Sequence, residues 1–184
     1  MKKGIWLLAA VLVLTAGLAA CGSGDELTKT LETTDGNFTF SVPESWDYYE
    51  GPEQGQEGLV LQMTNENGAS AAVFFYDNTQ YDYSADLCLE DLTNYYGDNI
   101  IGEVQDGQAG DMDARRFEYN MVDLDEEGNE ADFHGYEYVI DTPYGTMDVD
   151  IYYSQDKVMG KIFKPSESQL ELLSSIVQSM VVNE

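Results

Sequence analysis

The sequence predicts an α+β domain with a mainly antiparallel sheet that is flanked by a middle helix and a C-terminal helix. Three observations support this fold class. Several segments alternate apolar and polar residues between turns, as half-buried antiparallel strands do. Two other segments repeat apolar residues at helical spacing behind a serine that can cap a helix. Asn67 and Gly68 separate two of the alternating segments, and this dipeptide is a strong hairpin signal.

Residues 1–20 are predicted to be a secretory signal peptide. Lys2 and Lys3 give a basic start, and residues 5–20 form an uncharged apolar run that is too short for a comfortable membrane span. The run leads through Leu18-Ala19-Ala20 into Cys21, and this tetrapeptide resembles the lipobox of bacterial lipoproteins. The resemblance implies cleavage before Cys21, a diacylglyceryl group on its sulfur, and a location on the extracytoplasmic face of the cell membrane. An ordinary signal peptide and an uncleaved membrane helix are the alternatives.

Residues 21–35 are expected to form a lipidated tether, because they are small, polar and charged and show no periodicity. A single domain then covers residues 36–184. Its first strand is expected from Phe38 to Val42, where alternation stops at Pro43, and residues 44–58 are expected to form a long loop.

A hairpin and a helix are expected next. Alternation predicts strands over residues 59–63 and 71–75. Ser84 can cap a helix that ends near Tyr96, on which Cys88, Leu92 and Tyr95 share one face. With Cys21 lipidated, Cys88 has no disulfide partner, and lone cysteines on apolar faces are usually small core residues. We therefore expect Cys88 to be buried.

The second half is predicted to be mostly strand. Alternation covers residues 115–121, 136–140 and 147–153, with Asp148 and Asp150 on the face opposite Val149. Val158–Phe163 is a candidate for one more strand. Ser166 and Gln169 form a capping box that opens a C-terminal helix ending near Met180. One core is expected to hold residues from both halves: Phe38, Phe40, Phe117, Ile151, Leu173 and Val177.

The charge restricts the partners. Two of the 8 basic residues lie in residues 1–20, so the mature chain has 6 basic residues against 35 acidic ones. Such a chain is repelled by nucleic acid and by anionic lipid, so membrane attachment is expected to come from the lipid on Cys21. The charge is expected to serve solubility. Attraction of cations or of cationic ligands is the alternative.

No catalytic residue and no cofactor are predicted. Nucleophilic catalysis needs a nucleophile, a base and a partner that orients the base, and the chain has only one histidine, His134. One histidine and one unlipidated cysteine, Cys88, are too few for a structural zinc site. His134 is expected to be exposed where a strand begins. Gly107-Gln108-Ala109-Gly110 is too short for a phosphate loop and lacks a following lysine. Paired carboxylates for glycoside hydrolysis stay an open alternative, because acidic residues are abundant.

Two sets of residues are candidates for binding. Asp123, Asp125 and Glu127, followed by Gly128, imitate the start of a calcium loop, but His134 stands at the twelfth position in place of a bidentate glutamate. We therefore expect an acidic hairpin turn, with weak calcium binding as the alternative. The second set consists of tyrosines in predicted loops, which suit recognition of sugars or peptides. These tyrosines are Tyr48, Tyr49, Tyr81 and Tyr83.

Three segments resemble the PsbP-like family, whose α/β/α sandwich occurs in many bacterial lipoproteins. Residues 36–46, which include Phe38-Thr39-Phe40-Ser41-Val42-Pro43 and Trp46, resemble its opening strand. Residues 112–119 resemble its central strand and residues 172–180 its closing helix, so the resemblance covers most of residues 36–184. A fold-level resemblance carries no chemistry by itself.

The expected function is that of a surface-anchored, non-enzymatic binding or accessory module of the cell envelope. Its partner is expected to be an envelope protein, a peptide or a glycan whose identity the sequence does not give. The alternatives are a calcium- or cation-responsive structural protein of the envelope and, third, an envelope enzyme.

Overall fold

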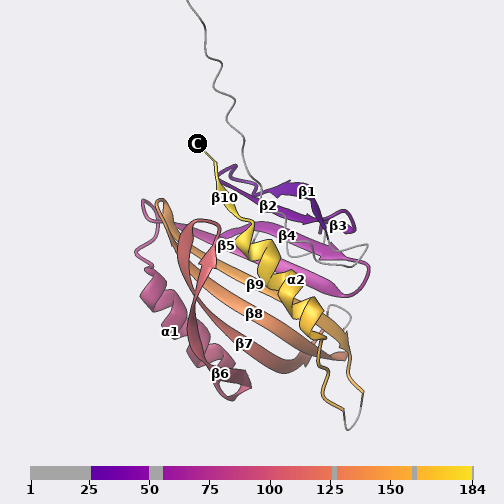
Figure 1. The fold of residues 1–184 in the computed structure, drawn as a ribbon. Helices are drawn as coiled ribbons and strands as arrows, with labels where there is room; N and C mark the ends of the chain where they lie inside the picture. The colour runs from indigo at the N-terminus through magenta and orange to yellow at the C-terminus, as the bar shows by residue number, and fades with distance from the viewer. Residues whose placement is uncertain (1–25, 50–55, 126–127, 159–160, 184) are drawn as a thin grey trace, which may run out of the picture.

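The computed structural model describes residues 26–49, 56–125, 128–158 and 161–183 of the 184 residues. Within these ranges the chain forms two α-helices, a short 3-10 helix and ten strands, and Figure 1 shows how the helices and strands are arranged. The first half contains β1 (Leu27–Glu32), β2 (Phe38–Pro43), β3 (Trp46–Tyr48), β4 (Leu59–Asn65), β5 (Ala69–Asp77), α1 (Ala85–Tyr96) and η1 (Gly97–Asn99). The second half contains β6 (Ile100–Ala109), β7 (Met112–Leu124), β8 (Glu130–Thr142), β9 (Gly145–Asp156), α2 (Glu167–Gln178) and β10 (Val181–Val182).

The strands form two sheets. The larger sheet has the order β3-β4-β5-β9-β8-β7-β6, the smaller has the order β1-β2-β10, and all the neighbouring strands pair antiparallel. This confirms the predicted α+β class, with its mainly antiparallel sheet, middle helix and C-terminal helix. Among the described residues, no helix is long and apolar enough to span a membrane.

The two helices cover opposite faces of the larger sheet. Adjacent residues of a strand point to opposite faces, and on β8 Glu137 contacts Tyr96 of α1 while Tyr138 contacts Ser174 of α2. The smaller sheet lies on the α2 side, where Ser179, just after α2, bonds the backbone of Ser41 in β2. The molecule is therefore layered, with α1 on one face and α2 together with the small sheet on the other (Figure 1).

Local sequence explains the turns and helix starts. In the β4–β5 hairpin, Asn65 Oδ1 accepts hydrogen bonds from the amides of Asn67 and Ala69, and Gly68 adopts a φ of 78° that favours glycine. Ser84 caps α1 by accepting from Leu87 N. Ser166 and Gln169 form the predicted capping box of α2.

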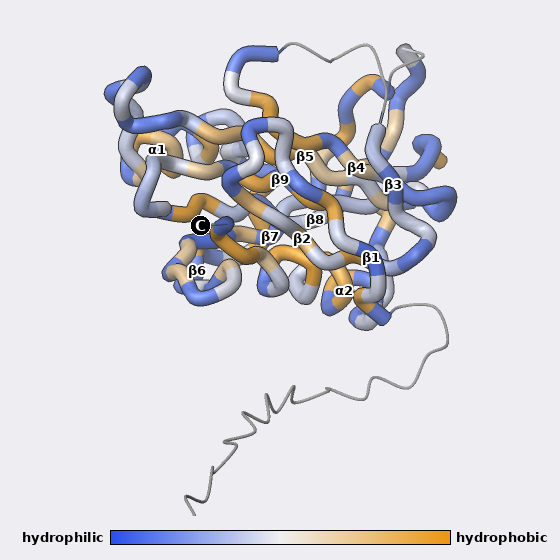
Figure 2. Tube along the Cα trace, turned by 90° about the horizontal axis from the view of Figure 1, so that it is seen from above, coloured by the Kyte–Doolittle hydropathy of each residue, from blue (hydrophilic) through white to orange (hydrophobic). Residues whose placement is uncertain are grey.

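The main core lies between the larger sheet and the α2 side. Phe38, Phe40, Ile151, Leu173 and Val177 all belong to it, as predicted. In Figure 2 the hydrophilic segments lie mainly in the peripheral loops, and hydrophobic stretches concentrate in the interior.

Phe117 is a correction to the expected single core. It lies in a second apolar cluster with Tyr96 and Tyr119 on the α1 side. The pleat of β7 turns Phe117 and Tyr119 toward α1, whereas Ala114 of the same strand turns toward the main core. Alternation thus identified a buried face correctly, but it assigned Phe117 to the wrong layer.

The domain begins earlier than residue 36. Strand β1 lies inside the segment expected to be a tether and pairs with β2 through Leu31↔Phe40, with Leu31 buried. Lys29 stands at a position of β1 where alternation would place an apolar, inward-facing residue, so the apolar–polar alternation of this strand was not apparent. Strand β3 likewise lies inside the expected loop 44–58, where Trp46 is fully buried and pairs with Asn65 of β4.

Two further expectations near the surface are wrong. The described part of Val158–Phe163 forms no strand. Its end is attached by a hydrogen bond from Asn120 Nδ2 to the Phe163 carbonyl at 3.1 Å, and Lys157, just before the segment, donates from Nζ to Asp132 Oδ1 at 2.6 Å. On α1, Tyr95 is 65% exposed and Tyr96 is buried in its place.

Candidate functional site

One face of β9 points toward α1 and carries polar side chains. Val149 and Ile151 point into the main core, so Thr146, Asp148 and Asp150 point toward the α1 face. On the neighbouring strand β8, Glu137 pairs in register with Asp150 and Val139 with Asp148. Glu137 of β8 therefore lies opposite Asp150 and diagonal to Asp148 of β9, beneath α1. We call these three residues the carboxyl cluster.

The carboxyl cluster is held by tyrosines. Tyr96 Oη donates to Glu137 Oε2 at 2.7 Å, and Tyr119 Oη donates to Asp150 Oδ1 at 2.6 Å. The two tyrosine rings pack with centroids 4.4 Å apart. Glu137 is 1% and Asp148 7% exposed.

Glu137 Oε1 and Asp148 Oδ1 are buried and have no hydrogen-bond partner among the described groups. A buried carboxylate oxygen without a donor is costly, so this environment favours the protonated, neutral form of these side chains. Among the described residues, no ion pair includes a member of the carboxyl cluster.

Burial governs the protonation of the carboxyl cluster. Burial and then the neighbouring Asp148 raise the pKa of Glu137 well above its ordinary value, and burial raises the pKa of Asp148. Burial also raises the pKa of Asp150 to about 7, against the opposing hydrogen bond from Tyr119. The carboxyl cluster therefore retains protons at a pH where an exposed aspartate is ionised.

A cavity of about 810 Å³ opens beside the carboxyl cluster, and we call it the acidic cavity. Thr146 and Val139 form part of its lining. Thr146 lies on the same face of β9 as Asp148, and Val139 lies on the same face of β8 as Glu137. The start of α1 forms another part of the lining. Arg115 lines it as well, with Nη1 2.7 Å from Asp86 Oδ1. Five aspartates line this cavity: Asp82, Asp86, Asp106, Asp113 and Asp141.

Two of the predicted tyrosines line the acidic cavity. Tyr81 and Tyr83 both pack edge-on against Tyr76, with ring centroids 5.7 and 4.9 Å apart. Their hydroxyls bond to carboxylates of the chain itself, Tyr81 to Glu57 at 3.2 Å and Tyr83 to Asp91 at 2.9 Å. The rings are therefore fixed in position as part of the wall.

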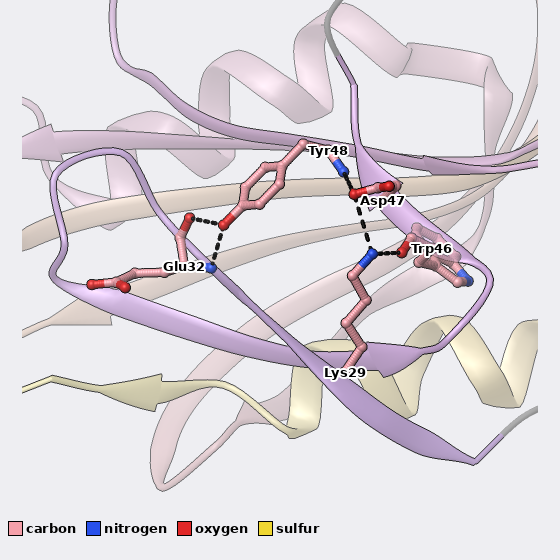
Figure 3. Close-up of polar contacts among 5 residues, drawn as sticks. All are labelled: Lys29, Glu32, Trp46, Asp47 and Tyr48. Carbon is pink, nitrogen blue, oxygen red and sulfur yellow. Dashed lines mark hydrogen bonds and ion pairs between the residues drawn. The ribbon is translucent and has the colours of Figure 1, made fainter.

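The other two predicted tyrosines lie elsewhere. Tyr48 joins β3 to β1, because its hydroxyl accepts from the Glu32 amide at 2.9 Å and donates to the Glu32 carbonyl at 3.0 Å (Figure 3). Beside it, Lys29 Nζ donates to the Trp46 carbonyl at 2.8 Å and lies 3.1 Å from Asp47 Oδ1. Tyr49 lines a second cavity. The four tyrosines do not form one site.

The candidate calcium ligands are described only in part. Cys21 and Glu127 lie outside the described residues. Asp123 Oδ1 accepts from Leu124 N at 2.7 Å, and Asp125 Oδ1 accepts from Asn129 N at 2.8 Å, as in a hairpin turn. Within the described ranges, no group of three or more histidine, cysteine or acidic residues is arranged to hold a metal ion.

His134 is a correction. It is the fifth residue of β8 and is 3% exposed, with Nε2 2.8 Å from Glu118 Oε1. Alternation places it on the α2 side, together with Tyr138. Cys88 lies on the α1 side and is buried, as expected, and burial and then Asp148 raise the pKa of its thiol to about 12. The sheet therefore separates His134 from a thiol that stays protonated.

The carboxyl cluster was not anticipated from the sequence. Alternation correctly placed Asp148 and Asp150 opposite Val149, but a face that carries aspartates normally faces solvent. The predicted middle helix was the available signal, because it has to pack against one face of the sheet and therefore buries side chains on that face. Comparison with known proteins found no matching family model and no matching curated protein.

Proposed function

We propose that this protein is a non-enzymatic binding module of the cell envelope, and that its ligand is an organic cation bound in the acidic cavity. The observation that carries this proposal is the lining of that cavity. Five aspartates face one arginine, and Asp86 already pairs with that arginine. A cationic ligand complements such a surface, whereas an anionic ligand is repelled.

The spacing of the carboxylates favours an organic cation over a metal ion. A calcium ion requires six to eight oxygen ligands that converge within about 2.6 Å of it, and the described residues contain no such group. An amine or guanidinium ligand that carries several charges can reach separated aspartates. The rings of Tyr81 and Tyr83 in the wall can also attract ammonium groups through their faces.

The location is proposed from the N-terminal sequence. The resemblance of Leu18-Ala19-Ala20-Cys21 to a lipobox supports a lipid anchor on the extracytoplasmic side. Because β1 begins at Leu27, the six residues from Cys21 span at most roughly 20 Å. The binding domain would then be held close to the membrane surface. The PsbP-like resemblance of residues 36–184 agrees with an accessory or binding role, and we propose that family for the domain.

Spermidine is a suitable probe for the acidic cavity. Calorimetric titration at fixed ionic strength should give saturable binding with a Kd on the order of 0.1 mM. The variant Asp82→Asn/Asp113→Asn/Asp141→Asn should bind at least about tenfold more weakly, since each exposed ion pair contributes up to about 1 kcal/mol.

The matched control removes the same charge elsewhere. Glu66→Gln/Asp98→Asn/Glu103→Gln changes three exposed carboxylates that do not line the acidic cavity, and it should leave the affinity unchanged. An equal loss in both triple variants would mean that spermidine responds only to net charge, and the proposal would then be wrong.

The anchor is tested separately by intact mass. Protein extracted from membranes should begin at a lipid-modified Cys21, and Cys21→Ser should abolish this modification. An unmodified thiol at Cys21 in the membrane-extracted protein would exclude lipidation.

A further inference from the structure

Helix α1 docks on the sheet through its two buried residues, Cys88 and Tyr96, and through the partly buried Leu89 and Leu92. Tyr96 reaches the sheet through its 2.7 Å hydrogen bond to Glu137. The ring of Tyr96 also packs against Phe117 and Tyr119. At the other end, α1 is held by the exposed pair of Asp86 and Arg115. The C-terminal half of α1 therefore rests on side chains that touch or adjoin the carboxyl cluster.

The surroundings offer little compensation for negative charge in the carboxyl cluster. Within the described ranges, Arg115 is the cation that acts on Cys88 beside the carboxyl cluster, and Asp86 already pairs with it. The other ionisable groups around the carboxyl cluster and the adjoining Cys88 are neutral or acidic. They are Tyr76 of β5, Tyr83 before α1, Cys88, Asp91, Tyr95 and Tyr96 of α1, and Tyr119 of β7.

Ionisation of Glu137 and Asp148 would place two carboxylates on neighbouring strands in a buried site. Glu137 Oε1 and Asp148 Oδ1 have no described donor to turn to. Like charges on neighbouring side chains repel strongly where water is excluded. Solvation by water would relieve the repulsion, and water reaches these oxygens if α1 moves away from β8 and β9.

We propose that α1 is a proton-operated cover, which stays docked while the buried Glu137 and Asp148 are protonated and undocks when they ionise. The same movement would shift Ser84, Ala85 and Asp86, which line the acidic cavity. The movement of α1 does not depend on the proposed function. Control of ligand access by pH rests both on this movement and on the proposed function.

The direction of the pH effect follows from the carboxylic acids. Burial raises the pKa of Glu137, Asp148 and Asp150 above the values they have when exposed to water. The closed state thus binds more protons than the open state between the two sets of values, and closure weakens as the pH rises. Closure is fully favoured below the ordinary carboxyl range near pH 4 and is lost as the pH rises through the raised pKa values of Glu137 and Asp148.

Cys88 reports on this movement, because it is the buried cysteine of α1. In the full chain carrying Cys21→Ser, Cys88 is the sole thiol. Its rate of maleimide labelling, divided by the rate for urea-unfolded protein at the same pH, measures protection without the intrinsic pH dependence of thiols. We expect protection to fall at least tenfold between pH 5 and pH 8.5.

Two variants isolate the carboxyl cluster. Glu137→Gln/Asp148→Asn/Asp150→Asn should show protection that is constant within threefold over this range. The control Glu90→Gln/Asp98→Asn/Glu103→Gln removes three exposed carboxylates outside the carboxyl cluster and should show the same fall as the parent. A parent protein with constant protection, or a fall that persists in Glu137→Gln/Asp148→Asn/Asp150→Asn, would overturn the proposal.

Hydrogen exchange of the unsubstituted protein keeps the test independent of folding of the variants. Amide protection in α1 should fall relative to that in β8 as the pH rises, because intrinsic exchange affects both elements equally. Loss of protection that is the same in α1 and β8 would indicate global unfolding and would refute a moving cover.

Discussion

Single residues on these strands have environments that depend on which face of the sheet they occupy. Phe40 and Phe117 both occupy the apolar positions of an alternating strand, yet Phe40 packs in the main core and Phe117 against α1. Glu137 and Tyr138 are adjacent in the chain and hydrogen bond to opposite layers. Two equally buried residues can thus pack in different layers, so the exposed fraction of a side chain does not say which neighbours it has.

The main core predicts a large effect at Phe40. This side chain is fully buried among residues of both sheets and α2, so Phe40→Ala should reduce the free energy of unfolding by about 3–5 kcal/mol. Denaturant titration measures the change. Leu87→Ala, at a residue that is 48% exposed on α1, is the control and should cost about 0.5 kcal/mol or less. A loss below about 1 kcal/mol for Phe40→Ala would contradict the packing.

Whole elements could be predicted where one side of the chain faces water. The alternation of β4, β5, β7, β8 and β9 and the capping serines of both helices were visible in the sequence. The exposed edge strand β6, the three-residue β3 and the two-residue β10 were not, because the sequence in these segments shows too little alternation. Strand β1 was missed because Lys29 interrupts its apolar positions.

The site was predicted less well than the fold, since it depends on long-range neighbours. Tyr81 and Tyr83 do line the acidic cavity, but Tyr48 serves to join β3 to β1. His134 was expected at the surface because strand ends are usually exposed, whereas β8 extends to Glu130 and buries it. Pairing between β8 and β9 brings Glu137 to Asp150, and no local pattern specifies that register.

The capping box of α2 can be tested at the scale of the element. Ser166 Oγ accepts from Gln169 N, and Gln169 Oε1 accepts from Ser166 N at 2.8 Å. Ser166→Ala should reduce the free energy of unfolding by about 1 kcal/mol, and Ser166→Gly by only a few tenths of a kcal/mol. Thermal or denaturant unfolding compares them. No measurable loss for Ser166→Ala would indicate that the cap hydrogen bond is unimportant.

At the scale of the whole molecule, the large negative net charge has the strongest effect on how stability depends on salt and pH. The chain has 35 acidic residues against 8 basic ones, and self-repulsion of this size disfavours the compact state at low ionic strength. The carboxyl cluster acts in the same direction, because its raised pKa values make the folded state prefer protons. Stability should therefore fall as the pH rises from about 4 through 7.

Cations should relieve this repulsion by screening, and a calcium site would behave differently. Screening depends on ionic strength and not on the identity of the cation, whereas a bound ligand stabilises by RT ln(1 + [L]/Kd) at concentrations far below those needed for screening. We expect the turn around Asp125, whose carboxylate accepts from Asn129 N, to bind calcium with at most about millimolar affinity. The melting temperature should then follow ionic strength, with little difference between calcium and magnesium at a fixed value. Asp125→Asn should leave that comparison unchanged. A large rise that is specific to calcium and that Asp125→Asn removes would establish a site formed by Asp123, Asp125 and Glu127, and would favour a calcium-responsive structural role over binding of an organic cation.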